Sequence, residues 1–121
     1  MQDDPRIPSR YRFRKRERIR SRSDIRRVFS EGARHSVRGM GLYVAPNDGP
    51  VTRAVFVTVR KYGNAVERNR ARRVVSECWR LAKPDARPGF DAVFVIYRGP
   101  DSMADREPQV RALARRAGLV A

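Results

Sequence analysis

The amino-acid sequence predicts a small single domain of the α+β class, a sandwich of a mainly antiparallel sheet with helices. Its length of 121 residues suits one domain of ordinary size. Two apolar, β-branched runs are typical of buried strands, and the segment between them has the apolar period of a helix. Together these observations predict the element order α-β-β-(β)-α-β-α, in which the bracketed strand is optional.

The N-terminal segment differs in composition from the rest of the chain. Residues 1–17 are rich in Pro and Arg and show no apolar periodicity. Such a segment is typical of a flexible basic tail. We therefore expect regular structure to begin near residues 21–24 and the folded domain to span residues 18–121.

The first helix is predicted just after this tail. Ser23 is a candidate N-cap, and Gly32 is a candidate stop signal. Between them, helical spacing relates Ile25, Val28 and Phe29. The segment therefore predicts a short helix with one apolar face.

Three strands are predicted from apolar runs. Residues 40–44 alternate as a strand does and end in the turn at 46–50, and residues 52–61 form a more apolar second strand. The run at 90–98 is nearly continuous, which predicts a strand buried on both faces. A further strand within residues 34–38 would complete the sheet.

A final helix is predicted over residues 103–117. Pro108 is compatible with it only in the first turn, so the regular part is expected to begin near Asp105. Its inward face is expected to carry Val110, Leu113, Ala114 and Ala117.

The central helix carries the densest group of charges. It is predicted to follow Gly63 and to end at the segment 84–89. On a helical wheel, one face collects Ala71, Val74, Val75, Cys78, Leu81 and Ala82, with Trp79 beside it as a packing residue. The opposite face collects Asn69, Arg72, Arg73, Ser76 and Arg80, with Arg68 and Arg70 at its margins.

The charge balance indicates a polyanionic partner. Lys and Arg number 28 against 13 acids, a formal net charge of +15, and only three of the basic residues are lysines. Glu67 and Glu77 are the only acids between Arg60 and Arg80, too few to neutralise the helix. The arginine face therefore favours phosphate binding over the alternative of a solvated charged surface.

Other features exclude competing classes. The sequence has no apolar run near eighteen residues and no export signal, so no membrane partner is expected. Cys78 is the only cysteine, which rules out an intramolecular disulfide and fits a reducing cytoplasm. We therefore expect a cytoplasmic protein that binds nucleic acid.

The sequence offers no catalytic site of its own. His35 is the only histidine and is expected in a surface loop, and the acids are scattered without a paired spacing. Neither a metal-ligand cluster nor a Gly-rich nucleotide loop appears, so no small-molecule substrate is expected.

The segment GNAVERNRARRVV, residues 63–75, resembles the signature of the bacterial ribonuclease P protein subunit. The family's pattern Gly-x-Ala-Val-x-Arg-Asn-Arg-x-x-Arg is filled by Gly63, Ala65, Val66, Arg68, Asn69, Arg70 and Arg73. The likeness extends over residues 18–119, although the Lys-rich approach to the helix is one residue short.

This resemblance implies a left-handed β-α-β crossover, contrary to the usual hand. It also implies a protein that assists a catalytic RNA in removing the 5′ leader from precursor tRNA, with Mg²⁺ held mainly by the RNA. The residues implied for binding the catalytic RNA are Lys61, Arg68, Asn69, Arg70, Arg72 and Arg73. Those implied for a leader-binding cleft are Ile25, Phe29 and Tyr43, with Ile25 standing where a Phe is usual.

Two other functions share part of this evidence. A ribosomal protein or general RNA-binding module would have the same charge and size, but would not require the cleft aromatics or the Arg-Asn-Arg order. A self-sufficient basic nuclease would need the acid and base cluster that the sequence lacks.

Overall fold

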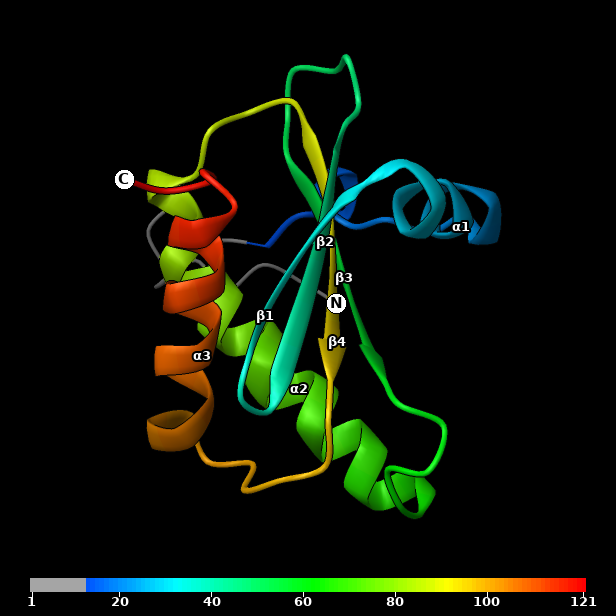
Figure 1. Cartoon of the computed structure of the whole chain (residues 1–121), viewed down its shortest axis with the longest axis vertical. Helices are drawn as coiled ribbons and strands as arrows, with labels where there is room; N and C mark the ends of the chain where they lie inside the picture. The colour runs from blue at the N-terminus through cyan, green and yellow to red at the C-terminus, as the bar shows by residue number, and fades with distance from the viewer. Residues whose placement is uncertain (1–12) are drawn as a thin grey trace.

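A computed structural model describes residues 13–121, which form three helices, two short 3₁₀ turns and one four-stranded sheet (Figure 1). The elements in order are η2 (Lys15–Glu17), α1 (Arg22–Glu31), β1 (Ala33–Val37), β2 (Met40–Pro46), β3 (Arg53–Thr58), α2 (Ala65–Ala82), η3 (Lys83–Asp85), β4 (Phe90–Ile96) and α3 (Met103–Arg116). This architecture confirms the predicted α+β class, and β1 is the optional strand.

The sheet is mixed, with the strand order β1-β2-β4-β3. β1 pairs antiparallel with β2, and β2 pairs antiparallel with β4, whereas β3 runs parallel to β4. The mainly antiparallel sheet is therefore as predicted, and β2 and β4 are its two inner strands. The parallel pair β3 and β4 is joined through α2, and the left hand of this crossover stays a prediction.

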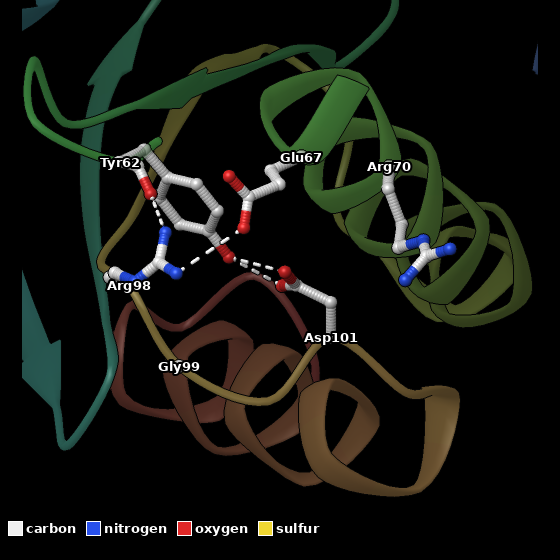
Figure 2. Close-up of a pocket in the computed structure, with 6 residues that line it drawn as sticks. All are labelled: Tyr62, Glu67, Arg70, Arg98, Gly99 and Asp101. Carbon is white, nitrogen blue, oxygen red and sulfur yellow. Dashed lines mark hydrogen bonds and ion pairs between the residues drawn. The ribbon is translucent and has the colours of Figure 1, made fainter. Parts of the chain in front are cut away.

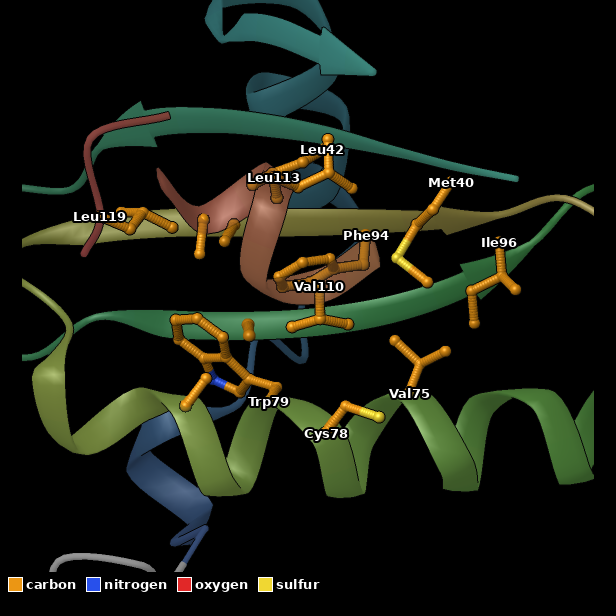
Figure 3. Close-up of a cluster of buried hydrophobic side chains, with 14 of the residues drawn as sticks. Met40, Leu42, Val75, Cys78, Trp79, Phe94, Ile96, Val110, Leu113 and Leu119 are labelled. Atoms are coloured by element: carbon orange, nitrogen blue, oxygen red, sulfur yellow. The ribbon is translucent and has the colours of Figure 1, made fainter. Parts of the chain in front are cut away.

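One face of the sheet builds the main core against α2 and α3 (Figure 3). The register aligns Leu42, Phe94 and Phe56 across three strands, so that these residues share that face. Phe56 and Phe94 stack with ring centroids 5.6 Å apart, and Trp79 of α2 lies 5.6 Å from Phe94. The predicted inward face of α3 is confirmed, because Val110, Leu113 and Ala114 are fully buried and Ala117 packs against them.

Of the helices within residues 13–121, α1 is the one that packs on the opposite face (Figure 1). A smaller cluster forms there from Ile19, Val28, Ala45 and Val93. Neighbouring apolar residues on the same face are only partly buried. The described part of the chain therefore packs closely on one face of the sheet and covers the other incompletely.

The predicted boundary between tail and domain is wrong. Residues 1–12 lie outside the described residues, but Phe13 is buried in the main core, 5.9 Å from the Phe56 ring. Glu17 also forms a 2.9 Å ion pair with Lys83. The folded domain thus begins before residue 18, because Phe13 packs into the core. Nothing in the sequence indicated this, since a single aromatic residue creates no apolar periodicity.

The first helix begins earlier than predicted. Ser21 rather than Ser23 is its N-cap, and the Ser21 hydroxyl accepts a 3.4 Å hydrogen bond from the amide of Asp24. Asp24 then lies in the first turn, where its charge suits the helix dipole. Gly32 does end the helix, and a side chain there would lie 2.4 Å from the carbonyl oxygen of Val28.

Three smaller expectations are also wrong. His35 lies in strand β1 rather than in a loop, and Leu81 is exposed at the end of α2 rather than packed inward. Pro108 is not in a first turn, because Ser102 caps α3 and the helix already starts at Met103. Proline has no amide hydrogen, so the carbonyl of Ala104, four residues before Pro108, receives no helical hydrogen bond. Ala104 is exposed, so water can solvate that carbonyl.

Among the helices of residues 13–121, none is both long and apolar enough to cross a bilayer.

Candidate RNA-binding surfaces

The start of α2 is fixed by its own sequence. Gly63 has φ +143°, and a Cβ there would lie 2.6 Å from a carboxylate oxygen of Glu67. Asn64 caps the helix by accepting from the amide of Glu67 at 2.9 Å, while Glu67 accepts from the amide of Asn64 at 3.1 Å. This reciprocal cap explains why the arginine-rich segment begins with Gly-Asn and carries Glu three residues later.

A buried polar network anchors the loop that leads into α2 (Figure 2). The hydroxyl of Tyr62 donates to the carboxylate of Asp101 at 2.6 Å and accepts from Arg106 at 2.8 Å. Arg106 is fully buried and also donates to Asp101 at 2.8 Å and to the carbonyl of Tyr97 at 2.9 Å. Burial raises the pKa of Tyr62, and so does its bond to Asp101, so the phenol stays protonated.

Arg98 ties the same loop to α2. Its guanidinium donates to the carbonyl of Tyr62 and forms a 3.2 Å ion pair with Glu67. The hydrogen bond from the Asn64 amide and the nearby Arg98 charge hold the pKa of Glu67 below its ordinary value. The first turn of α2 is therefore fixed in orientation before any ligand binds.

The outer face of α2 and the turn before it present the predicted basic residues. We call this surface the basic face and define it as Lys61, Arg68, Asn69, Arg70, Arg72 and Arg73. Lys61, Asn69, Arg70 and Arg73 are exposed, and the other two are half-buried. Arg68 donates to the carbonyl of Gly63 at 2.8 Å, and Arg72 donates to the side chain of Asn69. Within residues 13–121, neither Arg70 nor Arg73 is bound to a protein acceptor.

The acids near this face are already engaged. Glu67 pairs with Arg98, and Glu77 accepts from Arg80 at 2.9 Å. The Arg80 hydrogen bond lowers the pKa of Glu77, so that carboxylate is ionised but neutralised. The charge of the basic face is thus left for an external anion, which weakens the alternative of a surface stabilised by ion pairs.

On the other side of the molecule, two aromatic rings form an exposed pair. Phe29 of α1 and Tyr43 of β2 meet edge to face, with centroids 4.8 Å apart and planes at 72°. Phe29 is 39% exposed, so its ring is not a core residue, and Tyr43 is half-buried on the face opposite Leu42. Ile25 packs at the edge of the smaller apolar cluster, so the structure brings the three predicted cleft residues to one face.

The same face continues past the ring pair over residues that the sequence did not single out. Val55, Val57 and Val95 are only half-buried there. Tyr97 is 36% exposed, and its ring lies beside Gly41, where a Cβ would be 3.8 Å from it. We call this surface the open face: the Phe29 and Tyr43 pair, the three valines and Tyr97. From strand alternation, Tyr97 could have been predicted to share a face with Val95. The apolar run of β4 is nearly continuous, however, so the sequence does not show which of its residues face outward.

An ionic cluster fastens α1 to the sheet beside the open face. Arg27 of α1 donates to the fully buried carboxylate of Asp91 at 2.9 Å. Arg53 donates to both oxygens of that carboxylate, at 2.8 and 2.6 Å, and Asn47 donates to it at 2.9 Å. Burial alone would raise the pKa of Asp91, but the bonds from Arg53 and Asn47 and the two cationic charges lower it. In the sequence, the one sign of this cluster is Asp91 itself, an aspartate at the start of a predicted buried strand.

The described residues do not fit a metal site. Glu67 and Asp101 line one pocket of about 280 Å³, but the first is bound to Arg98 and the second to Tyr62 and Arg106 (Figure 2). In residues 13–121, no three His, Cys, Asp or Glu side chains gather to hold a metal ion. Cys78 is buried, which raises the pKa of its thiol to about 11 and makes it an unreactive core residue.

Comparisons with known proteins agree with this geometry. The family model described as Ribonuclease P matches residues 13–117. The ribonuclease P protein component of a Roseiflexus species is 39% identical over 100 residues, which cover 83% of this chain and 81% of the relative. That of Clostridium novyi is 36% identical and covers 88% and 98% of the two chains.

Solved structures show the same fold. The RNase P protein from Thermotoga maritima superposes with a TM-score of 0.74 at 27% identity, over 83% of this chain and 96% of that one. The Staphylococcus aureus RNase P protein superposes with a TM-score of 0.77 over 87% and 98% of the two chains, and its 21% identity supports the fold alone.

The fold and the basic face define a small α+β protein that works with RNA. The chain belongs to the ribonuclease P protein family. Its role is that of the protein subunit of ribonuclease P, the endoribonuclease of tRNA 5′ processing.

Proposed function

We propose that the basic face binds the catalytic RNA of ribonuclease P through its phosphates. The observation that carries this proposal is the pair of exposed guanidinium groups of Arg70 and Arg73, which have no protein acceptor within residues 13–121, on a helix whose acids are already paired. Arginine suits such a site because its planar fork binds phosphate oxygens bidentately. The fixed first turn of α2 supports this proposal, because the helix then loses little conformational entropy when RNA binds.

The open face is proposed to hold the single-stranded 5′ leader of precursor tRNA. Exposed rings are stacking platforms for unpaired bases, and Phe29 and Tyr43 lie together on this face. Ile25 has no ring and would add only apolar contact. Stacking is tolerant of base identity, so we expect this surface to accept leaders of different sequence.

The Mg²⁺ needed for RNA-catalysed hydrolysis is proposed to be held mainly by the RNA. The carboxylates of the described residues are scattered or already paired, so residues 13–121 are proposed to contribute charge and position rather than metal ligands. The proposed compartment is the cytoplasm, on the ground of the single cysteine. A general RNA-binding module, the alternative function, is not favoured by the family match.

Salt dependence tests the basic face. The double variant Arg70→Ala, Arg73→Ala should bind the catalytic RNA more weakly, and the slope of log affinity against log salt should become shallower by about 2. Each phosphate contact releases roughly one counterion, which is the reason for the change in slope. Filter binding at several salt concentrations measures it.

A matched control uses two exposed arginines that lie outside the basic face. The variant Arg87→Ala, Arg115→Ala removes the same formal charge and leaves the basic face intact. Equal changes in slope for the two double variants, with both proteins folded, would show that only total charge matters and would contradict the assignment.

A further inference from the structure

A pocket of about 450 Å³ lies at the outer edge of β3, apart from the ring pair. It is built from the segment before α1, from β3 and from the middle of α2. β3 is the last strand of the sheet, and Arg18 and Ile19 pair with it only at Ala54. The pocket therefore occupies a part of the sheet edge that no described strand covers.

The charges of this pocket are strongly one-sided. Four arginines line it, Arg18, Arg20, Arg72 and Arg73, against one acid, Glu77. The acid is neutralised by its ion pair with Arg80 outside the pocket. Arg20 and Arg73 are exposed, and neither is bound to a protein acceptor within residues 13–121. Arg20 and Arg73, from two distant segments, thus converge on one pocket whose single acid is already paired with Arg80.

The wall of the pocket is apolar and joins the two sides of the sheet. Val55 and Phe56 are consecutive in β3, so their side chains point to opposite faces, yet both line the pocket. The pocket consequently passes around the edge of β3, from the basic face toward the open face. A bare phosphate would satisfy the arginines and leave this apolar wall unused.

We propose that this pocket binds one unpaired nucleotide of the catalytic RNA, with its phosphate on the arginines and its ribose and base against Val55 and Phe56. A positively charged groove with apolar platforms is the usual device for single-stranded nucleic acid. Its volume lies within the range of sites for small ligands. The choice of the catalytic RNA rests on the proposed function of the basic face, because Arg72 and Arg73 belong to both.

Arg20 gives the sharpest test, since it lies outside α2 and forms no hydrogen bond or ion pair with the rest of residues 13–121. Arg20→Ala should weaken binding of the catalytic RNA alone, without tRNA, by about tenfold, the loss of one charge-assisted hydrogen-bonded contact. The matched control Arg26→Ala removes an exposed arginine of α1 outside the pocket and should weaken it less than threefold. Thermal melting checks that both variants are folded.

Two further readouts identify what occupies the pocket. If one nucleotide contacts both arginines, the losses from Arg20→Ala and Arg73→Ala should be less than additive in the double variant. A photo-crosslinker on Ser76→Cys, at the pocket wall, should attach to an unpaired nucleotide of the catalytic RNA, whereas one on Ser30→Cys of α1 should not. The native Cys78 does not interfere, because it is buried and its thiol pKa is about 11.

The outcomes separate the pocket from the basic face. Equal losses for Arg20→Ala and Arg26→Ala would overturn the pocket, and so would crosslinks from residue 76 that map only to the leader of precursor tRNA. Failure of the wild-type protein to bind the catalytic RNA would instead overturn the proposed function itself.

Discussion

The two faces of the sheet use the same strands for different purposes. Toward α2 and α3, Leu42 and Phe94 are fully buried. One residue further along each strand, Tyr43 and Val95 point the other way and stay partly exposed beside α1. Strand alternation thus buries one set of residues in the core and leaves the next set accessible for the proposed binding of the leader.

The two faces also differ in what holds their helices. α2 and α3 are held by a large apolar core, whereas α1 rests on a small cluster and on the ion pair from Arg27 to Asp91. Ion pairs can hold a helix at one end of a sheet while the rest of that sheet face stays uncovered. Within residues 13–121 the open face is therefore left incompletely covered, as the proposed leader site requires.

The largest expected effect is on the closed face. Phe94→Ala should lower the free energy of unfolding by about 3–5 kcal/mol, because it leaves a cavity among Phe56, Trp79 and Val110. Urea denaturation followed by circular dichroism measures the loss. A loss below about 1 kcal/mol would contradict the view that this face carries the stability of the domain.

The next effect concerns the attachment of α1. Asp91→Asn should lower the free energy of unfolding by about 3 kcal/mol at neutral pH, because it leaves Arg27 and Arg53 without a buried counter-charge. The control Glu31→Gln removes an exposed acid that also contacts Arg27, and should change stability by less than about 1 kcal/mol. Similar losses in both variants would show that the buried carboxylate has no special role.

The pH dependence of stability sharpens the same test. The pKa of Asp91 is lower in the folded protein than in the unfolded chain, so its contribution is fully present above the ordinary aspartate pKa. It is lost as the pH falls from about 4 through the folded pKa. The difference in stability between wild type and Asp91→Asn should therefore shrink in acid, and a constant difference from pH 7 to pH 3 would refute this linkage.

The sequence could predict the features that depend on local pattern. The helical period of α2 correctly placed Val75 and Cys78 inward and the arginines outward. Alternation in β2 correctly set Tyr43 apart from Leu42. These features need only the geometry of one element, which its own residues determine.

Features that depend on contacts across the fold could not be predicted in this way. Phe13 is part of the core because Phe56 lies beside it, and nothing in its neighbours in sequence indicates that. The convergence of Arg20 with Arg73 requires β3 to be the edge strand. Pro108 is tolerated within α3 because Ala104, four residues earlier, is exposed, which depends on how the helix lies on the fold and not on its composition.

The central claim is that the open face binds the leader, and Tyr43 tests it most directly. Tyr43→Ala should weaken the affinity of the assembled ribonucleoprotein for precursor tRNA by about 1–3 kcal/mol, the value of one stacking platform. Tyr43→Phe keeps the ring and should retain nearly all of the affinity. Binding of mature tRNA, which has no leader, should be almost unchanged in both variants. Equal losses on precursor and mature tRNA in Tyr43→Ala would contradict the account.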